Sequence, residues 1–346
     1  MKFLKFPLIL LAFTALFFTA CDKDDEIDLD LRDVDLFTSS NTSGTIETYD
    51  FSEINDDDDM TVTSKSNTVP YADADGIYYD DSNDRLIQVS RTDNRVYAYN
   101  DFKDLADGAA ATPSLSGPEG AFTNARGITF GRNRVIVAQD GNDANNNENK
   151  IIIFNVEDDR ITLRNTYTVD FNLWGVHVED ETLYAIEDNS NRVAVFNEIF
   201  DNLDGAITPS KVVAIEGIVR THGLHFSDAI GEDLMILTDV GSADSDNDGK
   251  IIFIEDFDDL LDNTENNGTI ALSEQMVISG QNTQLGNPVD VEWDHLQNQV
   301  FVAERKRDGG LVLVFDMPEN TGTTSPTPIF SRASPGIASV ALDLGL

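Results

Sequence analysis

The sharpest chemical motif of the sequence is an acidic run, Asp244-Ser245-Asp246-Asn247-Asp248-Gly249-Lys250. Carboxylates at alternate positions before a glycine are typical of loops that wrap Ca²⁺, because oxygen ligands suit this hard cation and glycine permits a sharp turn. Glu255 completes the spacing, but it lies at the far end of an expected strand, too distant to bind. We therefore predict a calcium site made by Asp244, Asp246 and Asp248. The alternative is a solvated acidic hairpin tip.

Motifs of covalent catalysis are absent from the sequence. It contains no G-x-S-x-G nucleophile turn, no P-loop and no H-E-x-x-H metalloprotease helix. Its one cysteine, Cys21, stands near the amino terminus, which leaves no thiol elsewhere to act as a nucleophile. The sequence therefore argues against covalent catalysis.

A repeated three-strand unit organises the chain. In the clearest copy, one strand begins at Gly175, a second begins at Leu183 and ends in acids, and a third follows Arg192. Five such units begin at intervals of 51, 48, 48 and 67 residues, at Gly76, Gly127, Gly175, Gly223 and Asp290. Short strands rich in Val, Ile, Tyr and Phe at a period of about fifty residues are typical of a β-propeller.

The two ends of the chain complete a sixth unit. A lone first strand, 336–343, has no partners after it, and two strand patterns, 34–38 and 44–51, precede the first full unit. Joining them closes the ring and removes the open sheet edge. The predicted fold class is therefore all-β, a six-bladed propeller of four-stranded antiparallel blades over residues 33–346, with the last blade built from both termini.

One phrase of the sequence carries a family resemblance. From Leu183 to Phe196 it reads strand, acid, asparagine-containing turn, arginine and apolar strand. It resembles the NHL repeat, and the chain from residue 33 onward is similar to the NHL-repeat and TolB-like superfamily of six-bladed propellers. The resemblance implies a fold and leaves the activity open, because propellers host many functions.

A ligand site is predicted at the mouth of the propeller's central channel. The residue before each first strand and the residue after each second strand lie on one face around this mouth, where pockets form. The residues predicted to bind ligand are Asp75, Arg126, Trp174 and His222 from the first set, and Glu187, Asp239 and Glu304 from the second. This ring is more varied than structure alone requires. The alternative is a hydrated mouth without function.

Two histidines occupy one repeated position. His177 and His225 stand in the same column of the first strands as Tyr78, Thr129, Glu292 and Ala341. Because strand side chains alternate in direction, this column faces either a neighbouring blade or the channel. We interpret both as hydrogen-bonded structural histidines, and His295 as a solvated turn residue on the face opposite the mouth.

A hydrolase is the alternative function. Gluconolactonase and regucalcin-like propellers of the same superfamily hold one divalent cation in the mouth with Glu, Asn and Asp, and the metal polarises a lactone. Asp75-Gly76 is similar to their usual strand start, whereas Arg126, Trp174 and His222 depart from it. The resemblance leaves open a cation site through Asp75, Glu187, Asp239 and Glu304.

Composition restricts the class of partner. The chain has 346 residues, with 63 acidic and 23 basic side chains and a formal net charge of −40. Such a surface repels phosphate backbones and attracts cations, so we expect no nucleic-acid partner. Apolar residues make up 40% of the chain, which indicates a folded domain rather than a disordered one.

The amino terminus predicts a cellular address. Lys2 and Lys5 precede an apolar run, 6–18, so residues 1–20 are predicted to be a signal peptide. The segment Phe18-Thr19-Ala20-Cys21 resembles a bacterial lipobox, which implies lipidation of Cys21. Residues 21–32 read as an acidic tether, similar to the tag that directs many lipoproteins of Bacteroides-like bacteria to the cell surface.

These observations converge on one expected function. We expect an outer-membrane lipoprotein displayed on the cell surface, attached through its lipid only, and monomeric. It would act as a binding module for a ligand, glycan or protein, with calcium as a stabilising ion. The metal-dependent hydrolase of the gluconolactonase type is the alternative.

Overall fold

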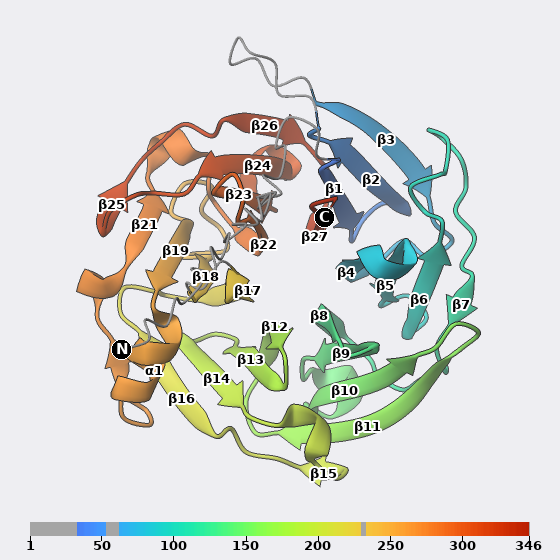
Figure 1. Cartoon of the computed structure of the whole chain (residues 1–346), viewed down its shortest axis with the longest axis horizontal. Coiled ribbons are helices and arrows are strands. Elements are labelled where there is room, and N and C mark those ends of the chain that lie inside the picture. The colour runs from blue at the N-terminus through green and yellow to red at the C-terminus, as the bar shows by residue number, and fades with distance from the viewer. Residues whose placement is uncertain (1–32, 53–61, 230–232, 346) are drawn as a thin grey trace, which may run out of the picture.

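The computed structural model describes residues 33–52, 62–229 and 233–345 of the chain. These residues form six sheets around a central axis, which confirms the all-β, six-bladed propeller (Figure 1). The predicted signal peptide, Cys21 and the acidic tether lie outside the described residues.

The first three blades follow one another along the chain. Blade 1 consists of β4 (Ala74–Asp80), β5 (Arg85–Ser90), β6 (Arg95–Asn100) and β7 (Leu115–Ser116). Blade 2 consists of β8 (Ala125–Gly131), β9 (Arg134–Gln139), β10 (Asn149–Val156) and β11 (Ile161–Val169). Blade 3 consists of β12 (Leu173–Glu179), β13 (Thr182–Glu187), β14 (Arg192–Phe196) and β16 (Lys211–Ile215).

The remaining three blades complete the ring. Blade 4 consists of β17 (Thr221–Ser227), β18 (Leu234–Asp239), β19 (Lys250–Glu255) and β21 (Met276–Ser279). Blade 5 consists of β22 (Pro288–Asp294), β23 (Gln299–Glu304), β24 (Leu311–Asp316) and β26 (Phe330–Ala333). Blade 6 consists of β27 (Ile337–Asp343), β1 (Asp35–Ser40), β2 (Thr45–Asp50) and β3 (Thr63–Thr68).

Three blades carry a fifth strand that the sequence does not predict. The short strands β15 (Gly205–Ala206), β20 (Thr269–Ile270) and β25 (Gly322–Thr324) pair in parallel with the outer strands β11, β16 and β21. Each belongs to a link within the following blade. An outer strand leaves a row of unpaired N–H and C=O groups, and the next blade's link covers part of that edge.

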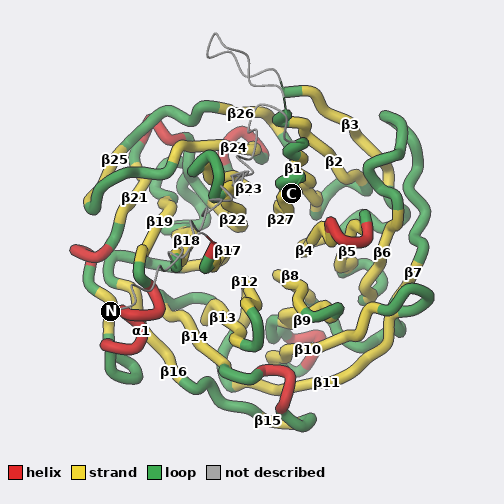
Figure 2. The backbone as a smooth tube through the Cα atoms, in the orientation of Figure 1, coloured by secondary structure: helices red, strands yellow, loops and turns green. Residues whose placement is uncertain are grey.

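Helical turns lie in the connections between strands (Figure 2). Among the described residues, the α-helix is α1 (Phe257–Asn263), which follows β19 in blade 4, the blade with the longest repeat. The 3₁₀ turns are η2 (Asp81–Asn83), η3 (Asp143–Asn145), η4 (Ile199–Asp201), η6 (Leu272–Glu274), η7 (Gln281–Thr283) and η8 (Arg307–Gly309). No helix in the described part of the chain combines the length and the apolar character needed to span a membrane.

Both termini build blade 6, as predicted. The innermost strand β27 comes from the carboxyl end and pairs antiparallel with β1, with Phe37 opposite Ala341. The Phe37 ring is fully buried and stacks on Tyr79 of blade 1 at a centroid separation of 4.6 Å. This contact joins the last blade to the first and closes the ring.

Six apolar clusters hold the blades together. Each cluster collects side chains from two neighbouring blades, so the core is divided into six interfaces around the axis. Near the axis the first strands approach closely. A Cβ atom on Gly223 would lie 2.7 Å from the Cα of Asp290 in the next blade, which explains why strands begin with glycine there.

Candidate binding site in the central channel

Four of the predicted mouth residues lie in one contiguous group. The rings of Trp174 and His222 stack with centroids 3.7 Å apart and planes 1° apart. The Arg126 guanidinium carbon lies 4.1 Å from the Trp174 ring centre, and Arg126 Nη1 lies 3.2 Å from Asp75 Oδ2. Because these residues come from blades 1 to 4, the group bridges four blades at the start of their innermost strands.

This group fills the mouth. The space beside Asp75, Arg126 and Trp174 has a volume of only about 20 Å³. A cavity of that size holds about one water molecule. These four predicted residues therefore lie together, but they leave no room among themselves for an organic ligand.

Asp188 contacts this group through His222. The sequence predicts the neighbouring Glu187 as a ligand residue and does not indicate Asp188. Its carboxylate lies 3.3 Å from His222 Nε2 and 3.0 Å from Arg220 Nε. Burial opposes its ionisation, but His222 and Arg220 outweigh burial and lower the pKa of Asp188 to about 2. Burial lowers the pKa of His222 to about 4, so this imidazole is neutral at pH 7.

Asp239 and Glu304 bind the backbone of neighbouring loops. Asp239 is fully buried and accepts hydrogen bonds from the backbone N–H groups of Val219, Arg220 and Gly241 at 2.9–3.1 Å. Glu304 is fully buried as well and accepts backbone N–H groups from the loops at 286–287 and 306–307 at 2.9–3.0 Å. Glu187 pairs with Arg192 Nε at 3.3 Å. These three acids thus bind partners other than Arg126, Trp174 and His222.

The predicted calcium residues lie in the exposed connection between β18 and β19. The Asp248 carboxylate accepts a hydrogen bond from the Ser242 N–H at 3.1 Å, and Arg307 donates to the Asp246 carbonyl at 3.1 Å. The carboxylates of Asp244, Asp246 and Asp248 are not gathered around one point in the described structure. An ion would have to draw them together.

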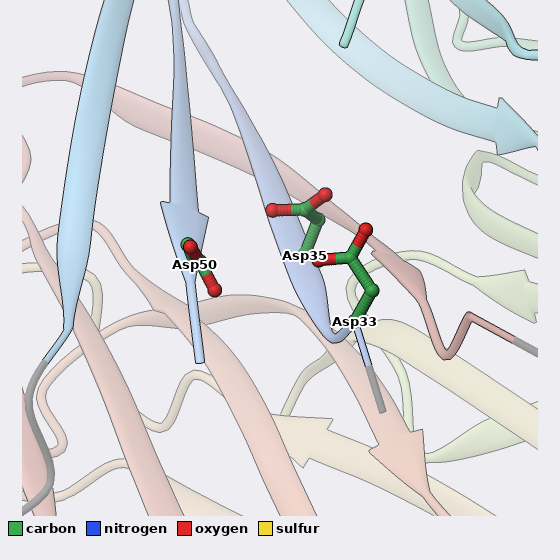
Figure 3. Close-up of side chains that lie close together, drawn as sticks. All are labelled: Asp33, Asp35 and Asp50. Atoms are coloured by element: carbon green, nitrogen blue, oxygen red, sulfur yellow. The ribbon is translucent and has the colours of Figure 1, made fainter. Parts of the chain in front are cut away.

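A different acidic group is gathered. Asp33, Asp35 and Asp50 lie with their carboxylate oxygens within 4.8 Å of one another, at the ends of β1 and β2 (Figure 3). Lys103 Nζ lies 2.9 Å from Asp35, 3.4 Å from Asp33 and 2.8 Å from Asp343. A lysine therefore supplies the positive charge for this group.

A larger cavity than the mouth space lies at the other end of the channel. It has a volume of about 270 Å³ and receives side chains from the innermost strands of all six blades. Its lining includes the column Tyr78, Thr129, His177, His225, Glu292 and Ala341. The sequence left open whether this column faces a neighbouring blade or the channel, and the structure shows that it faces the channel. His295 also lines the cavity, on the face predicted for it, and packs edge-on against Trp293.

Imidazoles and carboxylates meet in this cavity. His225 Nδ1 lies 2.8 Å from Glu292 Oε2, and His177 Nε2 lies 3.8 Å from Glu179 Oε2. The two imidazole rings are 5.0 Å apart between centroids. Burial lowers the pKa of His177, which keeps this ring neutral at pH 7. Sequence reasoning named both histidines but did not identify Glu292 as the partner of His225.

Asp290 lies between the two ends of the channel, since it borders both the mouth space and the larger cavity. It occupies the position that glycine holds in blades 1 to 4. Its carboxyl group accepts hydrogen bonds from the Ser339 hydroxyl and from the N–H groups of Val340 and Val291. Burial is the main cause that raises the pKa of Asp290 to about 7.

Comparison with known proteins identifies the fold. No protein-family model matches the chain, and no curated protein sequence matches it. A chain from the crystal structure of a nidogen/laminin complex superposes with a TM-score of 0.60 at 11% identity, over 90% of this chain and 99% of that one.

Two further solved structures are similar. A putative 6-phosphogluconolactonase from Bacteroides uniformis gives a TM-score of 0.57 at 10% identity, over 90% of this chain and 99% of that one. A periplasmic gluconolactonase from Pseudomonas aeruginosa gives 0.56 at 13% identity, over 89% and 98%. Identities this low establish a shared propeller fold and nothing about activity.

Proposed function

We propose that the protein is a surface-displayed binding module that takes a small ligand into the channel cavity beside His177, His225 and Glu292. The observation that carries this proposal is the cavity itself: about 270 Å³, with polar side chains converging from successive blades. Concave sites with a few convergent polar groups are the usual form of small-ligand sites. The module would be attached to the outer membrane through lipid on Cys21.

The cavity constrains the ligand. Its volume lies below the range of about 300–1,000 Å³ that drug-sized ligands occupy, so a single sugar unit or a molecule of similar size fits better than a peptide. Glu292 accepts hydrogen bonds and the neutral His177 both donates and accepts them, which suits hydroxyl groups. The Tyr78 ring offers an apolar face beside them.

A binding assay tests this proposal. Calorimetry or thermal-shift measurements on the domain from residue 22 onward, with a panel of monosaccharides, should identify a ligand whose affinity falls at least tenfold in Glu292→Gln. Glu265→Gln is the matched control, because Glu265 is exposed in a loop after α1. A ligand that binds both variants equally would contradict a site in the channel cavity.

The hydrolase alternative has weaker support. Two structural neighbours are described as lactonases, one of them putatively, but they share only the fold with this chain. A cation at the mouth would need Asp75, Glu187, Asp239 and Glu304, whose carboxylates already have protein partners. Divalent-cation-dependent lactone hydrolysis that Asp75→Asn abolishes would favour the hydrolase over the binding module.

The lipid anchor is testable separately. Cys21 follows a signal-like apolar run and is the only cysteine of the chain. Cys21→Ser should move the protein from the membrane fraction to the soluble fraction of the cell envelope. Protease treatment of intact cells would then establish whether the wild-type protein faces outward.

A further inference from the structure

The two histidines of the channel cavity come from neighbouring blades and face one another. His177 lies on β12 and His225 on β17, at equivalent positions of the repeat. Their side chains are 19% and 14% exposed, so both are held in the cavity wall rather than extended into solvent. Their ring centroids are 5.0 Å apart.

A carboxylate approaches one nitrogen of each ring. Glu292 lies beside Nδ1 of His225, and Glu179 lies beside Nε2 of His177. In metal sites a carboxylate commonly holds the far nitrogen of a ligating histidine, which fixes the ring and leaves the other nitrogen for the ion. This pairing leaves Nε2 of His225 and Nδ1 of His177 as the available nitrogens.

The spacing of the rings matches that of two histidines on one ion. With metal–nitrogen distances of about 2.0–2.1 Å and tetrahedral geometry, the centroids of two bound imidazoles lie roughly 5 Å apart. The observed separation is 5.0 Å.

We propose that the channel cavity binds one divalent transition-metal ion of the zinc type between His177 and His225, with Glu292 and Glu179 orienting the two rings. Two imidazoles with nearby carboxylates suit zinc, nickel or copper better than calcium or magnesium. Water or an oxygen atom of the ligand would take the remaining coordination positions. This inference rests on the proposed function for the choice of cavity and adds the ion to it.

Metal titration tests the inference. Chelator-treated protein with Zn²⁺ in calorimetry should bind one equivalent at this site, and His177→Gln and His225→Gln should each weaken it at least tenfold. The expected Co²⁺ complex should show the visible absorption of a four-coordinate site. His295→Gln is the matched control, because its ring lines the same cavity but packs against Trp293.

Four results separate the possible failures. Equal loss of zinc in His295→Gln, or unchanged zinc binding in both His177→Gln and His225→Gln, would overturn the site. Because the Co²⁺ spectrum is taken on wild-type protein, an octahedral spectrum also overturns it without relying on a variant. If zinc does not bind but a monosaccharide still binds in chelator, the inference fails while the proposed function stands.

Discussion

Trp174 and His222 lie face to face across the boundary between blades 3 and 4, with ring centroids 3.7 Å apart and planes 1° apart. Arg126 contacts the indole from blade 2, and Asp188 lies beside the imidazole. These contacts close one end of the channel. A buried and neutral histidine in such a position makes stability depend on pH.

His222 should make the protein less stable in mild acid. Its folded-state pKa is about 4, against an ordinary value of 6.5. Between these values the unfolded chain binds a proton that the folded protein does not, so stability falls as the pH drops from 6.5 towards 4. The shift corresponds to about 3 kcal/mol. Urea unfolding at pH 7 and 4.5 should show a smaller loss in His222→Gln than in wild type.

The control for this measurement is His295→Gln, at the other end of the channel. It should retain the part of the pH dependence that His222 causes. Asp188 stabilises the folded protein fully above its ordinary pKa of 3.8, because its folded pKa is about 2. Its contribution is lost mainly below pH 3.8, outside the range from pH 7 to 4.5 that is compared. Parallel curves for wild type and His222→Gln would contradict the prediction.

Asp290 should act in the opposite direction. Its folded pKa is about 7, raised from 3.8. The folded protein therefore keeps a proton that the unfolded chain releases, and stability falls as the pH rises from 4 to 7, by on the order of 4 kcal/mol. Asp290→Asn should gain stability relative to wild type over this range. The exposed Asp316→Asn serves as control, and an equal gain there would count against a buried carboxyl as the cause.

Asp239 should matter for folding rather than for binding. Its buried carboxylate holds three backbone N–H groups and pairs with Lys250 Nζ at 2.9 Å. Breaking a buried pair by removing one charge costs about 3–5 kcal/mol, so Asp239→Asn should lower the free energy of unfolding by about that much. Glu187→Gln, whose partner Arg192 is 35% exposed, should cost about 1 kcal/mol or less. A stable Asp239→Asn that loses ligand would reverse this assignment.

The sequence predicts the architecture well because the fold repeats. Glycine at the strand starts, alternating apolar strands and the incomplete last unit identify the six blades and their closure through β1 and β27. The grouping of Asp75, Arg126, Trp174 and His222 follows from the same register. The fifth strands β15, β20 and β25 are too short to leave a pattern of their own.

The direction of side chains near the axis is harder to predict. Four of the innermost strands carry a register irregularity at the glycine, as between Leu173 and Val176 or between Thr221 and Leu224. Such an irregularity changes the face to which the following side chains point. The alternation of side chains along a strand therefore left the direction of His177 and His225 open. It also predicted that Asp239 faces the mouth, whereas its carboxylate binds the backbone of a loop.

Calcium should stabilise the protein through the loop between β18 and β19. The aspartates at 244, 246 and 248 are exposed, and their carboxylates are not gathered around one point. A bound calcium ion would draw these carboxylates together and offset the repulsion between them. At a hundredfold excess over Kd, binding to the folded state alone contributes about 2.7 kcal/mol, and Tm should rise with calcium. Asp246→Ala should abolish that rise.

Asp143→Ala is the matched control for the calcium experiment, because Asp143 lies in the equivalent connection of blade 2, between β9 and β10. It should leave the calcium response unchanged. A rise in Tm that persists in Asp246→Ala would show that the ion binds elsewhere. The Asp33–Asp35–Asp50 group would then be tested with Lys103→Met. Lys103 Nζ offsets part of the negative charge of that group, so Lys103→Met should strengthen the calcium response if the ion binds there.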